Sequence, residues 1–136
     1  MRTNAGIDHQ ARVTFDTASN GTGSYAAANY IALTANATTE LATDTTLAGE
    51  ITTAGGGLVR AQATYAHTNG TNTVALTKTF TINSSDTTPT TPAKAGLFNA
   101  SSAGTMTYEK SIPSPPALAY ANGTGDSVAA TWTFTL

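Results

Sequence analysis

Apolar and polar residues alternate strictly along two stretches that flank the dipeptide Asn69-Gly70. Every second residue is apolar from Val59 to Tyr65, and the same period returns from Val74 to Ile82. A period of two is the pattern of a β-strand with one buried face. Asn-Gly supplies the positive φ angles of a type I′ turn. The chain from residue 59 to residue 82 is therefore predicted to form one long β-hairpin closed by such a turn.

The chain finishes on a third alternating run. Its apolar positions are Val128, Ala130, Trp132, Phe134 and Leu136, and alanine or threonine fills the positions between them. Threonine suits exposed strand positions because its branched Cβ favours the extended backbone. The pattern predicts an all-β scaffold with threonine on its exposed face and with Trp132, Phe134 and Tyr65 in the core.

Shorter strands are predicted at residues 29–34, 94–99 and 106–112, and the last of these places Met106, Tyr108, Lys110 and Ile112 on one face. The connection 35–57 contains two possible helical turns, at 39–41 and 44–47, and residues 84–92 form a loop by composition. Six or seven short strands separated by turns are typical of a sandwich or a barrel. We expect a single-domain antiparallel β-sandwich, jelly-roll-like, over residues 25–136, with an extended N-terminal arm over residues 1–24 that includes a short alternating piece at 12–15.

Charged residues make up 10% of the 136 residues, against about 25% in an average soluble domain. Lysine and glutamate normally protect sheet edges from unwanted pairing, and here they are scarce. Two interpretations follow. Either copies of the chain or another protein cover its edges and faces, or threonine, serine and glycine with short strands are sufficient for solubility.

The net charge of −2, with six scattered cations, argues against a nucleic-acid partner, which requires a basic stripe. The chain has no cysteine and therefore no disulfide and no thiolate metal site. No apolar run is long enough for a membrane span, and the first ten residues lack the pattern of a secretory signal. Synthesis in a cytoplasm, with no membrane partner, is the expectation.

Candidate catalytic and metal-binding residues are few and dispersed. His9 and His67 have no further metal ligands at a suitable spacing, so both are interpreted as surface histidines. A pair of carboxylates can act as acid and base in a glycosidase, but only the fold can bring two of them together. Asp44 and Asp126 are better explained as turn or cap residues. The carboxylates are Asp8, Asp16, Glu40, Asp44, Glu50, Asp86, Glu109 and Asp126. The sequence therefore predicts no catalytic residue, no metal and no cofactor.

Three other features have structural explanations. Six Asn-x-Ser/Thr triplets begin at Asn20, Asn36, Asn69, Asn83, Asn99 and Asn122. They follow from asparagine in turns and abundant threonine rather than from glycosylation. The run Gly55-Gly56-Gly57 lacks the Lys-Ser/Thr of a phosphate loop. Lys78 interrupts the apolar face between Leu76 and Phe80, and either snorkels to a sheet edge or pairs with an acid across an interface.

Several stretches together resemble the small structural proteins of tailed bacteriophages, over about residues 28–136. They are NYIAL at 29–33, DTTLAGEI at 44–51 followed by GLVRA at 57–61, AGLFNA at 95–100 with GTM at 104–106, and GDSV at 125–128. Such proteins are head decoration (cement) proteins or tail-fibre components, and the resemblance brings no catalytic residues.

The resemblance implies a virion protein on the capsid surface, most directly a capsid decoration protein. Its expected partners are the major capsid protein and further copies of itself, with which it would form a homotrimer. Low charge suits lattice contacts because few ions have to be desolvated. The arm over residues 1–24 is expected to order on a neighbouring capsid subunit. A tail-fibre or receptor-binding module is the alternative, with loops 35–57 and 84–92 as its recognition surface. A glycan hydrolase is a third interpretation, and we expect no such activity.

Overall fold

The computed structural model describes residue 3, residue 11, residues 14–16 and residues 26–136. The strands in this part are β1 (Tyr30–Thr34), β2 (Ala61–Gln62), β3 (Thr64–His67), β4 (Thr73–Thr81), β5 (Lys94–Phe98), β6 (Met106–Ser111), β7 (Tyr120–Ala121), β8 (Thr124–Gly125) and β9 (Ser127–Thr135). All of the pairings between them are antiparallel. The predicted all-β fold class is confirmed.

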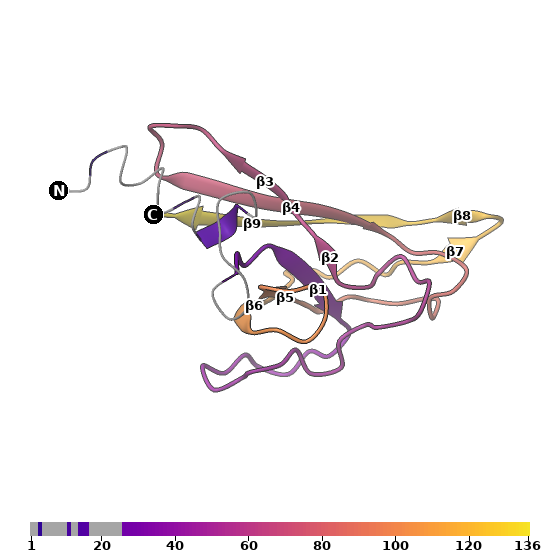
Figure 1. Ribbon diagram of the computed structural model, residues 1–136. Helices are drawn as coiled ribbons and strands as arrows, with labels where there is room; N and C mark the ends of the chain where they lie inside the picture. Colours follow the sequence, from indigo (N-terminus) through magenta and orange to yellow (C-terminus); the bar gives the residue numbers. More distant parts are fainter. Residues whose placement is uncertain (1–2, 4–10, 12–13, 17–25) are drawn as a thin grey trace.

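Two sheets face each other as a sandwich (Figure 1). Sheet A has the strand order β2-β1-β5-β6, sheet B has the order β3-β4-β9, and β7 and β8 form a separate ribbon. Ile31, Leu33 and Leu97 of sheet A and Leu76 and Phe80 of sheet B meet in one buried core. A jelly roll has eight strands in its two sheets. Sheets of four and three strands do not establish that topology, which stays a prediction.

The longest pairing joins β4 to β9 over nine residues, from Thr73 opposite Thr135 to Thr81 opposite Ser127. Val74, Leu76 and Phe80 of β4 are buried as the alternation predicts. The residues of β9 that face the same side are only half-buried, because β9 is the edge of sheet B and none of the described strands lies beyond it.

The predicted hairpin from residue 59 to residue 82 is correct only in the part next to the turn. Residues 64–67 pair with β4, but Ala61 and Gln62 pair with β1 in the other sheet. The Ala63 N–H donates to the carbonyl oxygen of Asn29 at 2.8 Å, at the point where the chain leaves sheet A. One alternating run thus crosses between the sheets while its apolar side stays on the core. Alternation reports the buried face of a strand and not its neighbour, so it gave no sign of this switch.

The prediction of a type I′ turn at Asn69-Gly70 is wrong. The Thr71 N–H donates to the Thr68 carbonyl oxygen at 3.0 Å, and of the two central residues only Gly70 has a positive φ, of 83°. This φ pattern is that of a type II turn, in a loop longer than the two residues of a type I′ hairpin. The second Asn-Gly, Asn122-Gly123, has positive φ at both residues (53° and 78°) and closes the tight hairpin between β7 and β8.

The predicted strand at residues 106–112 forms, but its alternation is interrupted. The pairing with β5 shifts register between Leu97 and Phe98, the mark of a β-bulge. Met106, opposite Phe98, therefore packs on the outer face of sheet A, whereas Tyr108, opposite Leu97, faces sheet B. The expectation that Met106 and Tyr108 share a face is wrong because the bulge adds one residue to the alternation.

The connection 35–57 covers the outer face of sheet A. Ala32, Leu47, Phe98 and Met106 form a second, smaller apolar cluster there. The expected helical turns are absent from this connection, which has isolated hydrogen-bonded turns at 41–44 and 47–50. Because both of its faces are covered, β5 is buried along its whole length.

Most of the predicted N-terminal arm, residues 1–24, lies outside the described residues. Within it, Ala11 and Phe15 are buried in the core. The Phe15 ring stacks on Phe134 with 4.6 Å between the ring centroids, and the Ala28 N–H donates to the Thr14 carbonyl oxygen at 3.0 Å. Thr14 and Phe15 have helical rather than extended backbone, so the local alternation there did not report a strand.

The glycine run at residues 55–57 serves close backbone packing. A Cβ on Gly57 would lie 1.7 Å from the carbonyl oxygen of Thr81 at the end of β4. Gly125 approaches the next carbonyl group, of Ile82, equally closely. These two glycines allow two segments of the chain, at residues 57 and 125, to pack directly against the backbone at the end of β4.

Gly57→Ala is expected to lower the free energy of unfolding by about 3 kcal/mol, because the added methyl group overlaps backbone that cannot move away freely. Urea denaturation followed by circular dichroism measures the change. The matched control is Gly123→Asn, since a Cβ there meets nothing within 4 Å and asparagine tolerates its positive φ. Equal loss in both variants would contradict the close approach at Gly57.

Candidate functional site

The described carboxylates are spread over the molecule and each of six has a structural role. Asp44 accepts a hydrogen bond from the Leu41 N–H (3.1 Å), which confirms it as a turn residue. Asp126 accepts one from the Ala119 N–H (2.9 Å), next to the paired residues Tyr120 and Gly125 of the β7–β8 ribbon and not within a turn. Asp86 accepts from the backbone N–H groups of Gly57 (2.8 Å) and Asn83 (2.9 Å). Glu40, Glu50 and Glu109 have partners described below. Among the described residues no three acidic or imidazole groups are placed to hold a metal ion.

Arg60 clamps three segments on the outer face of sheet A. Its guanidinium forms a two-pronged ion pair with Glu50, at 2.8 and 2.5 Å. It also donates to the carbonyl oxygens of Ala100 (3.2 Å) and Ala103 (2.7 Å), and it lies 3.5 Å above the centre of the Phe98 ring. With all of these contacts made inside the protein, Arg60 and Glu50 hold loops together and present little free charge to a ligand.

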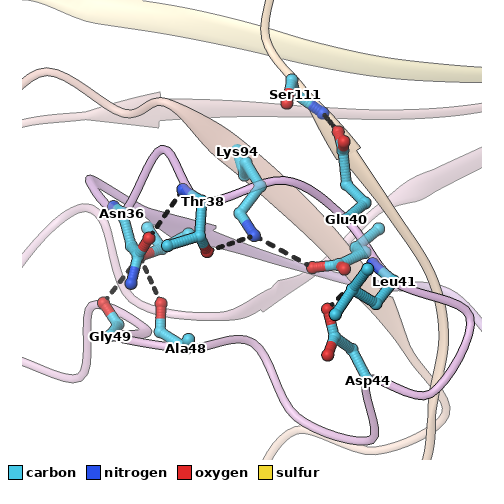
Figure 2. A network of polar contacts seen from close by, with 11 residues as sticks. Asn36, Thr38, Glu40, Leu41, Asp44, Ala48, Gly49, Lys94 and Ser111 are labelled. Atoms are coloured by element: carbon cyan, nitrogen blue, oxygen red, sulfur yellow. Dashed lines mark hydrogen bonds and ion pairs between the residues drawn. The ribbon is translucent and has the colours of Figure 1, made fainter.

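The second ion pair, Lys94 with Glu109, is almost completely buried, with the side chains 1% and 7% exposed. The Lys94 Nζ atom donates to Glu109 Oε2 at 3.3 Å and to Thr38 Oγ1 at 3.4 Å. Figure 2 shows Lys94 beneath the loop that carries Thr38. The other oxygen of Glu109, Oε1, is buried and has no hydrogen-bond partner among the described residues.

A hollow of about 300 Å³ lies next to this pair. Its lining is mostly hydroxyl-bearing, with Thr38, Thr39, Thr43, Thr45 and Thr46 beside Lys94 and Glu109. In the sequence, Lys94 is one of six scattered cations, and no motif around it predicts a buried ion pair. Its position in the sequence could have indicated the ion pair. Lys94 begins a run, Ala95 to Phe98, that is apolar on both faces, and a cation buried there needs a partner of opposite charge.

Glu40 ties the same loop to sheet A. Its carboxylate accepts a hydrogen bond from the backbone N–H of Ser111 (Figure 2). Hydrogen bonds from the Ser111 side chain, from the backbone of Glu40 itself and from the backbone of Ser111 lower the pKa of Glu40 from 4.5 to about 2. Thr38 over Lys94 and Glu40 at Ser111 thus both fasten the loop between β1 and β2 to sheet A.

The sandwich is open on the side where β6 and β9, the edges of the two sheets, lie. An apolar groove of about 280 Å³ runs there between Leu33, Ala95 and Ile112 on one side and Val128, Ala130 and Trp132 on the other. Trp132, predicted as core, faces inward as expected but is only half-buried because it lines this groove.

An aromatic cluster continues the open side. The rings of Trp132 and Phe134 are nearly parallel, with 6.0 Å between their centroids, and Tyr108 lies 5.0 Å from Phe134. Tyr108 is 46% exposed, which is unusual for so large an apolar side chain in this fold. The sequence did not predict Tyr108 in this role, because the bulge in β6 directs its side chain toward β9.

The outer face of sheet B carries no charge along β4 and β9. Hydroxyl pairs bridge the two strands, Thr77 with Thr131 at 3.2 Å and Thr81 with Ser127 at 2.7 Å. Lys78 lies on the opposite face, next to Ala130, partly exposed and without an ion-pair partner among the described residues. Partial exposure of Lys78 agrees with the snorkelling interpretation, while the alternative, an ion pair with an acid across an interface, stays a prediction.

Histidine and asparagine side chains take local roles. The His67 ring nitrogen Nδ1 lies 2.8 Å from the Thr73 carbonyl oxygen, across the turn between β3 and β4, while His9 and Asp8 lie outside the described residues. The side-chain oxygens of Asn36 and Asn83 accept from the N–H two residues on, at 2.8 and 2.9 Å. These Asx turns account for two of the Asn-x-Ser/Thr triplets.

A scan against protein-family models and searches of curated proteins and of solved structures found no match to this chain. In the described part, no helix is long and apolar enough to cross a membrane.

Removing one partner of the buried ion pair should lower the free energy of unfolding more than removing both partners does. We expect Glu109→Gln to lower the free energy of unfolding by about 3 kcal/mol, because Lys94 then stays buried without a counter-ion. The double variant Lys94→Met, Glu109→Gln is expected to be more stable than Glu109→Gln alone. Urea denaturation of the two single variants and the double variant forms a double-mutant cycle. Additive losses would contradict the pairing.

The Glu40 carboxyl carbon is expected to titrate by NMR with a midpoint near pH 2. Because folding lowers this pKa, the contribution of Glu40 to stability is complete above about pH 4.5 and is lost as the pH falls toward 2. In Ser111→Ala, which removes the largest cause of the shift, the midpoint should move back toward 4.5. A midpoint near 4.5 in the unmodified protein would show that the contact with Ser111 does not persist in solution.

Proposed function

We propose that this chain is a structural protein of a bacteriophage virion, most directly a capsid decoration protein that binds and stabilises the lattice of the major capsid protein. The observation that carries the proposal is the uncharged outer face of sheet B. Along β4 and β9 this exposed face consists of threonine, serine and alanine side chains. Docking it on another protein desolvates hydroxyl groups rather than ions, which lowers the cost of a permanent contact.

The placement of the charges supports a binding role rather than a catalytic one. Glu50 and Glu109 are paired with Arg60 and Lys94, and Asp86 is bonded to backbone N–H groups. These groups fasten loops to the sandwich and produce a stiff body. Such a body fits a component that stabilises a lattice by its contacts alone, with no cofactor.

One observation favours the second candidate, a tail-fibre or receptor-binding module. The hollow over Lys94 and Glu109 lies in the loop region 35–57 and is lined mostly by threonine side chains. Threonine hydroxyl groups both donate and accept hydrogen bonds, as the hydroxyl groups of a glycan receptor do.

Antibodies against the purified chain should label the heads of the encoding virions at many copies, as seen by electron microscopy. Purified protein should also bind heads that lack it. Thr79→Glu, on the exposed outer face of sheet B, is expected to weaken that binding at least tenfold, on the order expected when one charge is desolvated without a partner. Thr124→Glu, exposed on the ribbon of β7 and β8, is the matched control and should bind normally.

Label confined to the tail would replace the decoration role by the receptor-binding module. Virions without label would remove the virion role altogether.

A further inference from the structure

In the part of the chain that the structure describes, the two sheets of the sandwich have four edge strands, which differ in how well they resist pairing with another chain. β2 is two residues long and β3 is four, while the six residues of β6 include Glu109 and Lys110. β9, by contrast, is nine residues long and has no charge and no proline. It is also paired with β4 without a register shift. Short length, charge, proline and bulges are the usual protections of an edge, and β9 has none of them.

The hydrogen bonds of β4 to β9 show which backbone groups of β9 remain available. The Leu136 N–H donates to the Asn72 carbonyl oxygen at 2.7 Å, and the Asp126 carbonyl oxygen accepts from the Ile82 N–H at 3.0 Å. Even-numbered residues of the strand therefore direct their backbone groups toward β4, and odd-numbered residues direct theirs outward. Within the described residues no strand lies on that outer side.

We propose that the free edge of β9 pairs with β9 of a second copy, antiparallel and centred on Thr131. Thr131 is the midpoint of the strand Ser127–Thr135, so this register uses the full length of both strands. Thr131 then lies opposite Thr131 of the second copy, Ala129 opposite Thr133, and Ser127 opposite Thr135. These are the outward-directed residues, and their pairing forms about ten hydrogen bonds, as many as a typical protein interface contains.

The side chains on the inner face support the same register. Trp132 comes to lie opposite Ala130 of the second copy, and Phe134 opposite Val128, so a large ring meets a smaller side chain at each position. A shift of the centre to residue 132 places Trp132 against Trp132, and a shift to residue 130 places Phe134 against the carboxylate of Asp126. In the centred register the two copies of β9 pair without like-charge repulsion, because the strand has no charge. The half-exposed side chains of β9 become more buried.

A second copy is the occupant that fits, because a contact about a twofold axis needs one surface that is complementary to itself. The joined sheet has the order β3-β4-β9-β9-β4-β3 and doubles the uncharged outer face. The inference deepens the proposed structural role and rests on it for its biological purpose, while the pairing is tested on the purified chain alone. It gives a twofold dimer where the resemblance implies a homotrimer.

The test is cysteine cross-linking, which is clean because the chain contains no cysteine. In Thr131→Cys the two Cα atoms of the dimer are about 5.5 Å apart, within the range of a disulfide. We expect this variant to form a covalent dimer on mild oxidation. Thr135→Cys, on the same face of the same strand, is the matched control. In this register the two Cα atoms of residue 135 are about 26 Å apart, so this variant should stay monomeric in denaturing gels.

Sedimentation velocity of the unmodified chain should show a dimer. Thr131→Lys places two ammonium groups opposite each other and is expected to weaken the dimer on the order of tenfold, whereas Thr79→Lys on the central strand β4 should leave it intact. A chain that is monomeric at all concentrations, a trimer, or equal cross-linking of Thr131→Cys and Thr135→Cys would overturn the proposal. Virion labelling is independent of these results, so failure of the pairing and failure of the virion role are distinguishable.

Discussion

The nine-residue ladder between β4 and β9 is the contact on which the rest of this structure depends. It joins the C-terminal strand β9 to β4, the central strand of sheet B. It also fixes the close approaches at its end, where Gly57 and Gly125 pass the carbonyl groups of Thr81 and Ile82. A single register satisfies all of these constraints, because a slip by one residue would turn Leu76 and Phe80 to the threonine face.

Sheet A is organised differently, since both of its faces are covered. Its inner face contributes Ile31 and Leu97 to the main core, and its outer face holds Lys94 and Phe98 beneath loops. The two ion pairs found among the described residues, Arg60 with Glu50 and Lys94 with Glu109, lie on this outer face. Arg60 and Lys94 each bind a carboxylate and a second group from another loop, so the charges order the connections and leave the surface of sheet B uncharged.

Alternation predicted β4, β6 and β9 because each has one face against the core, and a period of two is the direct consequence. It did not predict the partner of each strand. The switch of residues 61–67 from sheet A to sheet B keeps the same residues buried and is therefore invisible in the pattern. The bulge in β6, which directs Tyr108 to the aromatic cluster and Glu109 to Lys94, depends on the pairing with β5 and not on local sequence. The two Asn-Gly turns differ because loop length, set by the pairing on either side, decides the turn type.

One edge of β9 is bonded to β4, and the other edge is paired with no strand within the described chain. This unpaired edge is the proposed contact for assembly. The most direct measurement is amide hydrogen exchange along β9 by NMR at increasing protein concentration. Amides of even-numbered residues, which face β4, should be protected at every concentration, and those of residues 129, 131 and 133 should gain protection as the concentration rises. Rapid exchange of these odd-numbered amides at all concentrations would contradict the account.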